Sequence, residues 1–342
     1  MRALVLEEYG RPPVLREVAR PEPGPQDVLV RVRANGLCAT DLKMIAGHIR
    51  TITLPHIMGH EVAGEVVETG PEVTHLRPGD PVVVHVYIGC GLCVSCRTGR
   101  ENLCPGVRRL GFELAGGFGE YLRVPARNAF RVAPSVPLEQ ASILSGSLAT
   151  AYHGLKHKGR IQLGDTVVIV GVGGLGVHAV QLARALGGRV IAADVVDEKL
   201  EAARAYGADA VINSAREDLP TRVRELTGGE GAEVVTEFVA GSGLPAVLRQ
   251  CLSCLRPGGR LVVAGYQYGH LLRVDTADLV YGQWELLGTR SSTKQDLVEV
   301  IRLVESGTVR PVVSTCYPID EVATALDRLQ RTPPLGRIVL IS

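Results

Sequence analysis

The chain has 342 residues, of which 46% are hydrophobic and 21% charged, and its formal net charge is +1 at pH 7. These values are ordinary for a globular protein with a sizeable core, and the length suggests about two domains. Because the net charge is close to zero, neither nucleic acid nor an acidic membrane surface is expected as a partner.

The N-terminal residues and the apolar runs favour a cytoplasmic protein. The opening segment MRALVLEE lacks the apolar run of a secretory signal, and no apolar stretch approaches the roughly 20 residues that span a bilayer. Of the eight cysteines, four lie within residues 90–104. Such crowding disfavours unstrained disulfides, and in a cytoplasmic protein it indicates metal binding.

The first third of the chain is predicted to be all-β and partly barrel-like. Val-rich runs at 27–34, 62–69 and 81–88 are bounded by Gly and Pro, and no long helical period interrupts them. We therefore expect a β-rich domain over residues 1–147.

The pattern changes near residue 140, where residues 138–157 have a helical period. Strands then alternate with helices, which implies βαβ units and a doubly wound parallel sheet covered on both faces. The predicted strands are 166–170, 189–194, 210–212, 234–238 and 260–264, and the predicted helices are 175–186, 197–206, 219–227 and 244–255.

The C-terminal part contains predicted helices at 294–306 and 321–331 and a final strand at 337–341. That strand is expected to return to the N-terminal β unit, which would make the β-rich domain discontinuous. The expected domains are thus 1–147 with 289–342, and a domain of alternating strands and helices at 148–288.

Residues 167–176, VVIVGVGGLG, contain a Gly-x-Gly-x-x-Gly fingerprint in the context that it needs, with a strand before it and a helix after it. Gly171 permits a tight turn, Gly173 lets the backbone approach a pyrophosphate, and Gly176 lets the helix pack on the strand. The diphosphate would then rest on the helix N-terminus. Two further loop residues are predicted to bind the cofactor: Gly174 and Leu175.

Asp194 and Lys199 are the predicted contacts to the cofactor ribose. Asp194 lies eighteen residues after Gly176, at the end of the second strand of the alternating region, where a carboxylate accepts hydrogen bonds from both ribose hydroxyls. The same carboxylate repels a 2′-phosphate, so NAD is predicted in preference to NADP. Arg204 is the residue that could still meet a phosphate.

The segment from residue 90 to residue 104 has the spacing Cys-x2-Cys-x2-Cys-x7-Cys, formed by Cys90, Cys93, Cys96 and Cys104. Four thiolates on one short loop can close a tetrahedron around Zn²⁺ without an open position, as in a structural zinc site. The cysteine ligands of an Fe–S cluster can have similar spacings in the sequence, so such a cluster is an alternative. A zinc module for nucleic acid is a further alternative, although the neighbouring sequence is not strongly basic.

A second group of candidate ligands lies at Cys38 and His60, a thiolate and an imidazole that are typical of catalytic zinc. Thr40 would place a hydroxyl beside the metal, where it could pass on the substrate proton. Asp41 would hold the far nitrogen of His60, and Glu61 is a direct or intermittent ligand. Any one of these residues alone would suit an ordinary core or turn, but together they favour a catalytic metal.

These motifs together resemble the zinc-containing alcohol dehydrogenases of the medium-chain dehydrogenase/reductase superfamily, and the resemblance covers essentially the whole chain, including GGFGEY at 116–121. It implies a chaperonin-10-like β domain that holds both zinc ions, a Rossmann domain, and a dimer or, commonly for chains this short, a homotetramer. By position, Cys38, His60 and Glu61 carry over as catalytic-zinc residues and Thr40 as the proton-relay hydroxyl.

Two positions depart from the pattern of that family. A third protein ligand usually precedes the segment Thr150-Ala-Tyr152, and counting back places it at Gly146, which has no donor side chain. A relay histidine is often found three residues after the hydroxyl, and Lys43 stands there instead.

The resemblance implies a reversible, zinc-dependent hydride transfer between an alcohol and its aldehyde or ketone, with NAD as the partner of the small-molecule substrate. The departure at Gly146 favours an alternative in the same superfamily, a zinc-independent alkene reductase of the enoyl or quinone type. The intact Cys38, His60 and Glu61 argue against that alternative. A non-catalytic nucleotide-binding protein is the third hypothesis, for which the retained ligand residues would be a coincidence.

Overall fold

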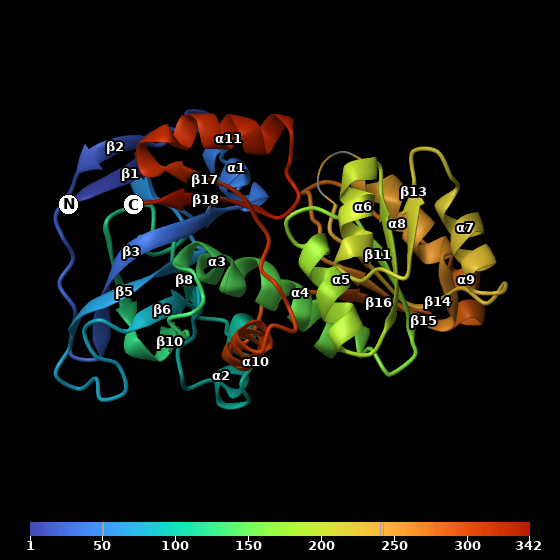
Figure 1. The fold of residues 1–342 in the computed structure, drawn as a ribbon, viewed down its shortest axis with the longest axis horizontal. Helices are drawn as coiled ribbons and strands as arrows, with labels where there is room; N and C mark the ends of the chain where they lie inside the picture. Colours follow the sequence, from blue (N-terminus) through green and yellow to red (C-terminus); the bar gives the residue numbers. More distant parts are fainter. Residues whose placement is uncertain (50, 240, 242) are drawn as a thin grey trace. The chain divides into compact units, whose positions relative to one another are not determined.

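The computed structural model describes residues 1–49, 51–239, 241 and 243–342. They form two compact units, Met1–Ala149 with Ser292–Ser342, and Thr150–Ser291. In Figure 1 the first unit takes the blue, green and red segments, and the second takes the yellow-green to orange segments. Within the described ranges, no helix is long and apolar enough to cross a membrane.

The first unit is built on a seven-stranded sheet around the long strand β3 (Asp27–Leu37). β3 pairs antiparallel with β5 (Val62–Thr69), β9 (Tyr121–Pro125) and β18 (Arg337–Ile341). The strand order is β10-β6-β5-β3-β18-β17, with β9 alongside β3. The expected return of the last strand to the N-terminal β unit is therefore confirmed.

Branched and aliphatic side chains from this sheet form the core of the unit, as their alternation along the Val-rich runs predicts. The other strands are β1 (Arg2–Leu6), β2 (Val14–Glu17), β4 (His56–Ile57), β6 (Pro81–Val84), β7 (Tyr87–Ile88), β8 (Arg108–Arg109), β10 (Ala129–Arg131) and β17 (Val313–Pro318). The helices are α1 (Ala39–Ile45), α2 (Val94–Arg97), α3 (Leu138–Ile143), α10 (Lys294–Glu305) and α11 (Val322–Arg331), with short 3₁₀ turns η1 (Glu101–Leu103), η2 (Ala126–Asn128) and η5 (Ile319–Glu321).

The helical run predicted at 138–157 is present, but it is not a regular α-helix. After α3 it widens into a π turn, η3 (Leu144–Leu148), continues as α4 (Ala149–His153), and widens again in η4 (Gly154–Gly159). Single π turns of this kind are frequent at functional sites, because they displace one side of the helix. Gly146 lies in the first of them.

The second unit is a six-stranded, wholly parallel sheet in the order β13-β12-β11-β14-β15-β16. Counted within the unit this is the order 3-2-1-4-5-6 of dinucleotide-binding folds, with the reversal between β11 and β14. Its strands are β11 (Thr166–Val170), β12 (Arg189–Asp194), β13 (Ala210–Asn213), β14 (Ala232–Glu237), β15 (Leu255–Val263) and β16 (Glu285–Gly288), and its helices are α5 (Gly176–Ala185), α6 (Asp197–Ala205), α7 (Leu219–Leu226), α8 (Leu244–Ser253) and α9 (Thr276–Gly282).

Some elements were not predicted or begin elsewhere. The structure adds β16, α9 and β17, and it starts β15 at Leu255, within the range predicted as helix. β16 has only four residues, which alternate between half-buried and exposed at the edge of the sheet, so it lacks the apolar run that identifies the buried strands.

A buried histidine, His85, follows β6 in the first unit. Its Nδ1 lies 3.4 Å from the carbonyl oxygen of Tyr87, and its Nε2 lies 3.2 Å from that of Ser292. Burial and the nearby Lys294 ammonium lower its pKa to about 4, against the opposing charge of Glu101. The imidazole is therefore neutral in the folded protein near pH 7.

This depressed pKa makes stability fall with acid. The imidazole of an unfolded chain has a pKa near 6.5, so between about pH 6.5 and 4 the unfolded state binds the additional proton and is favoured. We expect the wild type to lose about 2 kcal/mol of unfolding free energy from this group between pH 7.5 and pH 5, measured by urea unfolding. His85→Gln should reduce this pH dependence, whereas His48→Gln, at an exposed site, should keep it. An unchanged pH profile in His85→Gln would contradict the assignment.

Candidate active site and metal centres

The pairing of three strands brings together residues that are far apart in the sequence. Cys38 directly follows β3, and Glu61 directly precedes β5, to which β3 is antiparallel. The amide of Gly36 donates a hydrogen bond of 2.8 Å to the carbonyl oxygen of Glu61, which fixes the register. β18 pairs with the other edge of β3, with Ile338 opposite Leu37, and so places Arg337 at the same end of the sheet.

The side chains of Cys38, His60 and Glu61 converge at this end. One ligand atom from each, a sulfur, a ring nitrogen and a carboxylate oxygen, lies within 4.8 Å of the other two. Around a tetrahedral zinc ion such atoms lie roughly 3.5 Å apart, given bonds of about 2.0–2.3 Å. Small side-chain rotations would therefore close the three donors on one ion, and the structure brings together the three residues that the sequence predicts.

Asp41 and Thr40, on α1, flank this group. One carboxylate oxygen of Asp41 accepts a hydrogen bond of 2.8 Å from the amide of Cys38, and the other lies 3.3 Å from Nδ1 of His60. The latter pair is close but not aligned as a hydrogen bond, so we treat it as an ion-pair contact. The Oγ1 of Thr40 lies 3.5 Å from the Cys38 sulfur. Thr40 and Asp41 thus lie next to the three donor residues.

Arg337 is the part of the site that the sequence analysis did not predict. Its Nη2 donates to Oε1 of Glu61 at 2.8 Å and its Nε donates to Oε2 at 3.1 Å, so the carboxylate is held at both oxygens. Nη2 also lies 3.6 Å from the Cys38 sulfur. Arg337 is 6% exposed and Glu61 is 1% exposed, so this is a buried pair. The sequence signal that could have identified it is a basic residue at the start of β18, a strand whose other four residues are all apolar.

The charged groups around the donor atoms of Cys38, His60 and Glu61 favour a bound metal cation. Burial raises the pKa of Cys38, but Arg337 and His60 outweigh it and lower that pKa. Burial also opposes a charge on His60, yet Asp41 and Cys38 raise the pKa of its imidazole well above the usual value.

A metal-bound imidazole is neutral, so in the metal-bound state the charged groups are three anions, the thiolate of Cys38 and the carboxylates of Asp41 and Glu61, and one cation, Arg337. The two remaining negative charges equal the charge of one divalent ion. Buried charge of one sign is expensive unless it is compensated. The donor set and its charge therefore fit a zinc ion.

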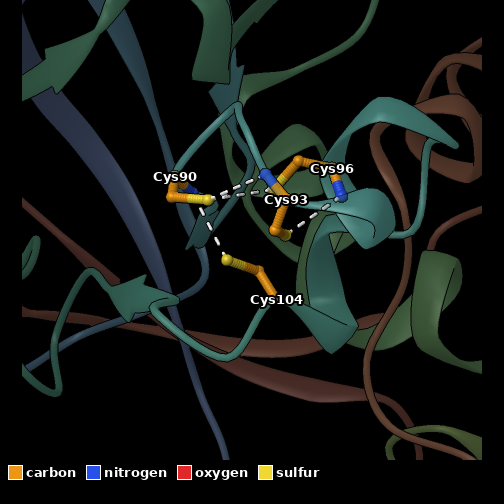
Figure 2. A group of neighbouring side chains, drawn as sticks. All are labelled: Cys90, Cys93, Cys96 and Cys104. Atoms are coloured by element: carbon orange, nitrogen blue, oxygen red, sulfur yellow. Dashed lines mark hydrogen bonds between the residues drawn. The ribbon is translucent and has the colours of Figure 1, made fainter.

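The second cysteine group occupies a loop that Figure 2 shows in detail. Its four thiols are free of disulfides and lie within 4.8 Å of one another. The sulfurs of Cys90 and Cys96 are 4.0 Å apart, close to the roughly 3.8 Å between two sulfurs on one tetrahedral zinc. An Fe–S cluster places several iron atoms between the cysteines and needs a wider arrangement, so this geometry favours a single ion.

Backbone amides of the loop are directed at these sulfurs. The amide of Cys93 donates to the Cys90 sulfur at 3.4 Å, and that of Cys96 donates to the Cys93 sulfur at 3.5 Å. Hydrogen bonds from the Leu92 and Cys93 amides lower the pKa of Cys90 to about 6. Such N–H···S contacts stabilise thiolates, and with four donors there is no open position, as in structural zinc sites.

The glycine-rich turn between β11 and α5 has the shape that the fingerprint predicts. Gly171 has a φ of +90°, which favours glycine. A Cβ atom at Gly176 would overlap the carbonyl oxygen of Gly171, so the helix begins against the turn. A Cβ at Gly173 would meet nothing within 4 Å, which leaves open space at the backbone where a diphosphate is expected. Two further predicted residues, Gly174 and Leu175, directly precede α5.

Asp194 ends β12 beside this turn. Its Oδ2 accepts a hydrogen bond of 2.7 Å from the amide of Val172, and its Oδ1 accepts from the amides of Val195 and Val196 at 2.8 and 3.1 Å. The carboxylate therefore holds the glycine-rich turn, and because three of its about four lone-pair sites are used, about one is left for a ribose hydroxyl. Lys199 lies on α6, half-buried, five residues after Asp194 in the sequence.

The chain matches known proteins along its whole length. Residues 24–134 match the alcohol dehydrogenase GroES-like domain, and residues 174–306 match the zinc-binding dehydrogenase domain. An alcohol dehydrogenase of Geobacillus stearothermophilus and an NAD-dependent alcohol dehydrogenase of Sulfolobus acidocaldarius are each 34% identical, over 99% of this chain and 99% of their own.

Among solved structures, the alcohol dehydrogenase of the archaeon Aeropyrum pernix has a TM-score of 0.92 at 34% identity, over 100% of both chains. The fold predicted from sequence, a chaperonin-10-like β-rich part with a Rossmann sheet, is thereby confirmed. The chain belongs to the zinc-containing alcohol dehydrogenases of the medium-chain dehydrogenase/reductase superfamily.

Proposed function

We propose that this protein is a zinc-dependent, NAD-linked alcohol dehydrogenase that catalyses reversible hydride transfer between an alcohol and its aldehyde or ketone. The observation that carries the proposal is the convergence of Cys38, His60 and Glu61 at one end of the β3 sheet. The Rossmann order of the second unit and the relatives named as NAD-dependent alcohol dehydrogenases support the cofactor.

In this proposal Cys38, His60 and Glu61 hold the catalytic zinc, and Cys90, Cys93, Cys96 and Cys104 hold a structural zinc. A bound catalytic zinc acts as a Lewis acid that makes the substrate hydroxyl easier to deprotonate near neutral pH. The lobe of four cysteines stabilises its loop and takes no part in the chemistry.

The remaining side chains orient the His60 ring or transfer the substrate proton. Asp41 holds the far side of His60 and fixes the orientation of its ring, the usual role of a carboxylate behind a metal-bound histidine. The Thr40 hydroxyl lies beside Cys38, where it would accept the substrate proton while its own proton leaves through the cofactor ribose or a water chain. Lys43, one turn further along α1, stands on the same helix as Thr40, at the position where the family pattern often has a relay histidine.

The nucleotide residues occupy the reversal point of the parallel sheet, where such folds bind dinucleotides. Gly171, Gly173 and Gly176 shape the turn, and the amides of Gly174 and Leu175 precede the N-terminus of α5, which attracts the diphosphate. Asp194 and Lys199 bind the adenosine ribose. The domain limits that we propose for these two roles are 1–147 with 289–342 for catalysis, and 148–288 for NAD binding.

Zinc content tests both metal assignments. We expect two zinc ions per chain in protein purified without chelators. Cys38→Ser should contain one and lose turnover while still binding NAD, since the nucleotide residues are untouched. Cys93→Ser should lose the other zinc and lower the Tm, because the loop loses its cross-link. Elemental analysis and NAD titration provide the readouts. A Cys38→Ser protein with full activity would exclude the mechanism. A single chelator-resistant zinc in the wild type would favour the alternative, a zinc-independent alkene reductase, and conjugated alkenes would then be the substrates to test.

Asp194 tests the cofactor assignment. The carboxylate should exclude a 2′-phosphate by charge. Asp194→Asn removes that charge, and it also replaces one of the two oxygens that accept from backbone amides, so activity with both cofactors should fall. The ratio of kcat/KM for NADP to that for NAD should nevertheless rise at least about tenfold. Steady-state kinetics with both cofactors measure the ratio. If the ratio is the same in the variant and the wild type, Asp194 does not select the cofactor.

We further propose that the protein acts in the cytoplasm as a homo-oligomer, a tetramer or a dimer. β16 forms the edge of the parallel sheet, and beside it Val280 and Tyr281 of α9 are exposed. Exposed apolar groups next to an unpaired strand edge suit association with another copy. Light scattering should give a mass of two or four chains, and Tyr281→Glu should shift it towards one. A monomeric wild type at micromolar concentration would rule this out.

A further inference from the structure

A buried carboxylate, Glu237, ends β14 in the parallel sheet of the second unit. Its side chain is 0% exposed. Its Oε2 accepts a hydrogen bond of 2.9 Å from the amide of Val239, and its Oε1 accepts from the amides of Ala264 and Gly265 at 3.0 and 2.7 Å. Val239 lies just beyond β14, whereas Ala264 and Gly265 directly follow β15. One carboxylate therefore ties together the segments that leave two neighbouring strands.

The segment after β14 is packed between two others. A Cβ atom at Gly265 would collide with the carbonyl oxygen of Val239 and lie 2.7 Å from Oε2 of Glu237. On the other side, the amide of Phe238 donates 2.8 Å to the carbonyl oxygen of the last residue of β11, and a Cβ atom at Gly171 would lie 3.0 Å from a methyl carbon of Val239. The segment after β14 is thus in contact with the glycine-rich turn and with the segment after β15.

Glu237 makes the same kind of hydrogen bonds as Asp194 makes in the other half of the sheet. Asp194 ends β12, and it accepts from an amide of the turn after the neighbouring strand β11 and from the two amides that follow it. Glu237 accepts in the same way from the segment after the neighbouring strand β15 and from an amide of its own segment. A buried carboxylate is costly without such partners, so each of the two fixes the backbone around it.

The second half of the sheet is where the nicotinamide end of the cofactor is expected. A sheet of this strand order consists of two mononucleotide-binding halves, and a dinucleotide lies across the reversal point between them, at the carboxyl ends of the strands. The proposed function places the adenosine ribose at Asp194 and the diphosphate at the N-terminus of α5. The nicotinamide therefore falls to the half formed by β14, β15 and β16, whose strand ends Glu237 joins.

We infer that Glu237 is a positioning residue for the nicotinamide end of NAD: it holds the segments after β14 and β15 at the spacing at which their backbone binds the ring. Because its side chain is fully buried and bonded to backbone amides, Glu237 acts through these segments. The inference rests on the proposed function, since it takes NAD as the cofactor.

The experiment compares NADH with ADP-ribose, which has the adenosine, the diphosphate and the second ribose but no nicotinamide. Calorimetric titration of the wild type and of Glu237→Gln gives a Kd for each compound. The glutamine would direct an NH₂ group at a backbone donor, so we expect its Kd for NADH to rise at least about tenfold, the effect of a buried donor without an acceptor. Its Kd for ADP-ribose should stay within about twofold of the wild-type value.

Two variants serve as controls. Glu233→Gln is the matched one, because Glu233 lies on the same strand but at its opposite end, where its carboxylate accepts from the amide of Thr166 at 2.8 Å. It should keep both Kd values. Asp194→Asn should weaken NADH and ADP-ribose by the same factor, since both contain the adenosine ribose. Only the Glu237 variant should change the ratio of the two Kd values.

Three results would overturn the inference. They are an unchanged Kd for NADH in Glu237→Gln, an equal loss for both compounds in a Glu237→Gln protein with a wild-type circular dichroism spectrum, and a wild type that binds NADH no more tightly than ADP-ribose. An equal loss would mean that the carboxylate supports the whole unit and not the nicotinamide end.

Gly265→Ala decides the case in which Glu237→Gln does not fold. This variant keeps the carboxylate, but its new methyl group pushes the segment after β15 away from Val239. It should weaken NADH selectively, and a loss shared equally with ADP-ribose, or no loss, would overturn the inference. The proposed function fails separately, through an active Cys38→Ser variant, which leaves these Kd values unchanged, so the two failures are distinguishable.

Discussion

The antiparallel pairing of β3 with β5 on one side and β18 on the other is the constraint on which the candidate active site depends. A strand end has one neighbour on each side, so this register alone places Cys38, Glu61 and Arg337 within contact distance of one another. Their positions in the sequence differ by up to 299 residues. Shifting either register by one residue would move alternate side chains to the opposite face and separate the donors.

The buried charges explain why these residues remain together. A carboxylate and a guanidinium in a dry environment are costly singly and tolerable as a hydrogen-bonded pair. The pair also fixes the orientation of the Glu61 carboxylate, because Arg337 donates hydrogen bonds to both of its oxygens. Gly36 and Gly146 leave room for this carboxylate. The sheet core beneath, rich in Val and Leu, keeps the strand ends from moving apart.

Sequence patterns were sufficient to predict the parts of the structure that depend on residues close together in the chain. The strand at Thr166–Val170, the glycine turn and the strand at Arg189–Asp194 have the predicted bounds, because apolar runs, glycine conformation and strand length act over a few residues. The four-cysteine loop was predictable for the same reason. Arg337 was not, since its burial against Glu61 depends on a pairing between distant segments, and a basic residue before an apolar strand fits a surface equally well. The π turn at Leu144–Leu148 also has no local sequence signal.

The discontinuous first unit has a consequence for biosynthesis. All residues of the second unit, Thr150–Ser291, leave the ribosome before the segment Ser292–Ser342 that completes the first. The nucleotide-binding sheet can therefore fold while the partner of Glu61 is still untranslated. The strand that carries Arg337 is translated last, so the pairing of β18 with β3, and with it the buried ion pair of Glu61 and Arg337, can form only after the rest of the chain has been made.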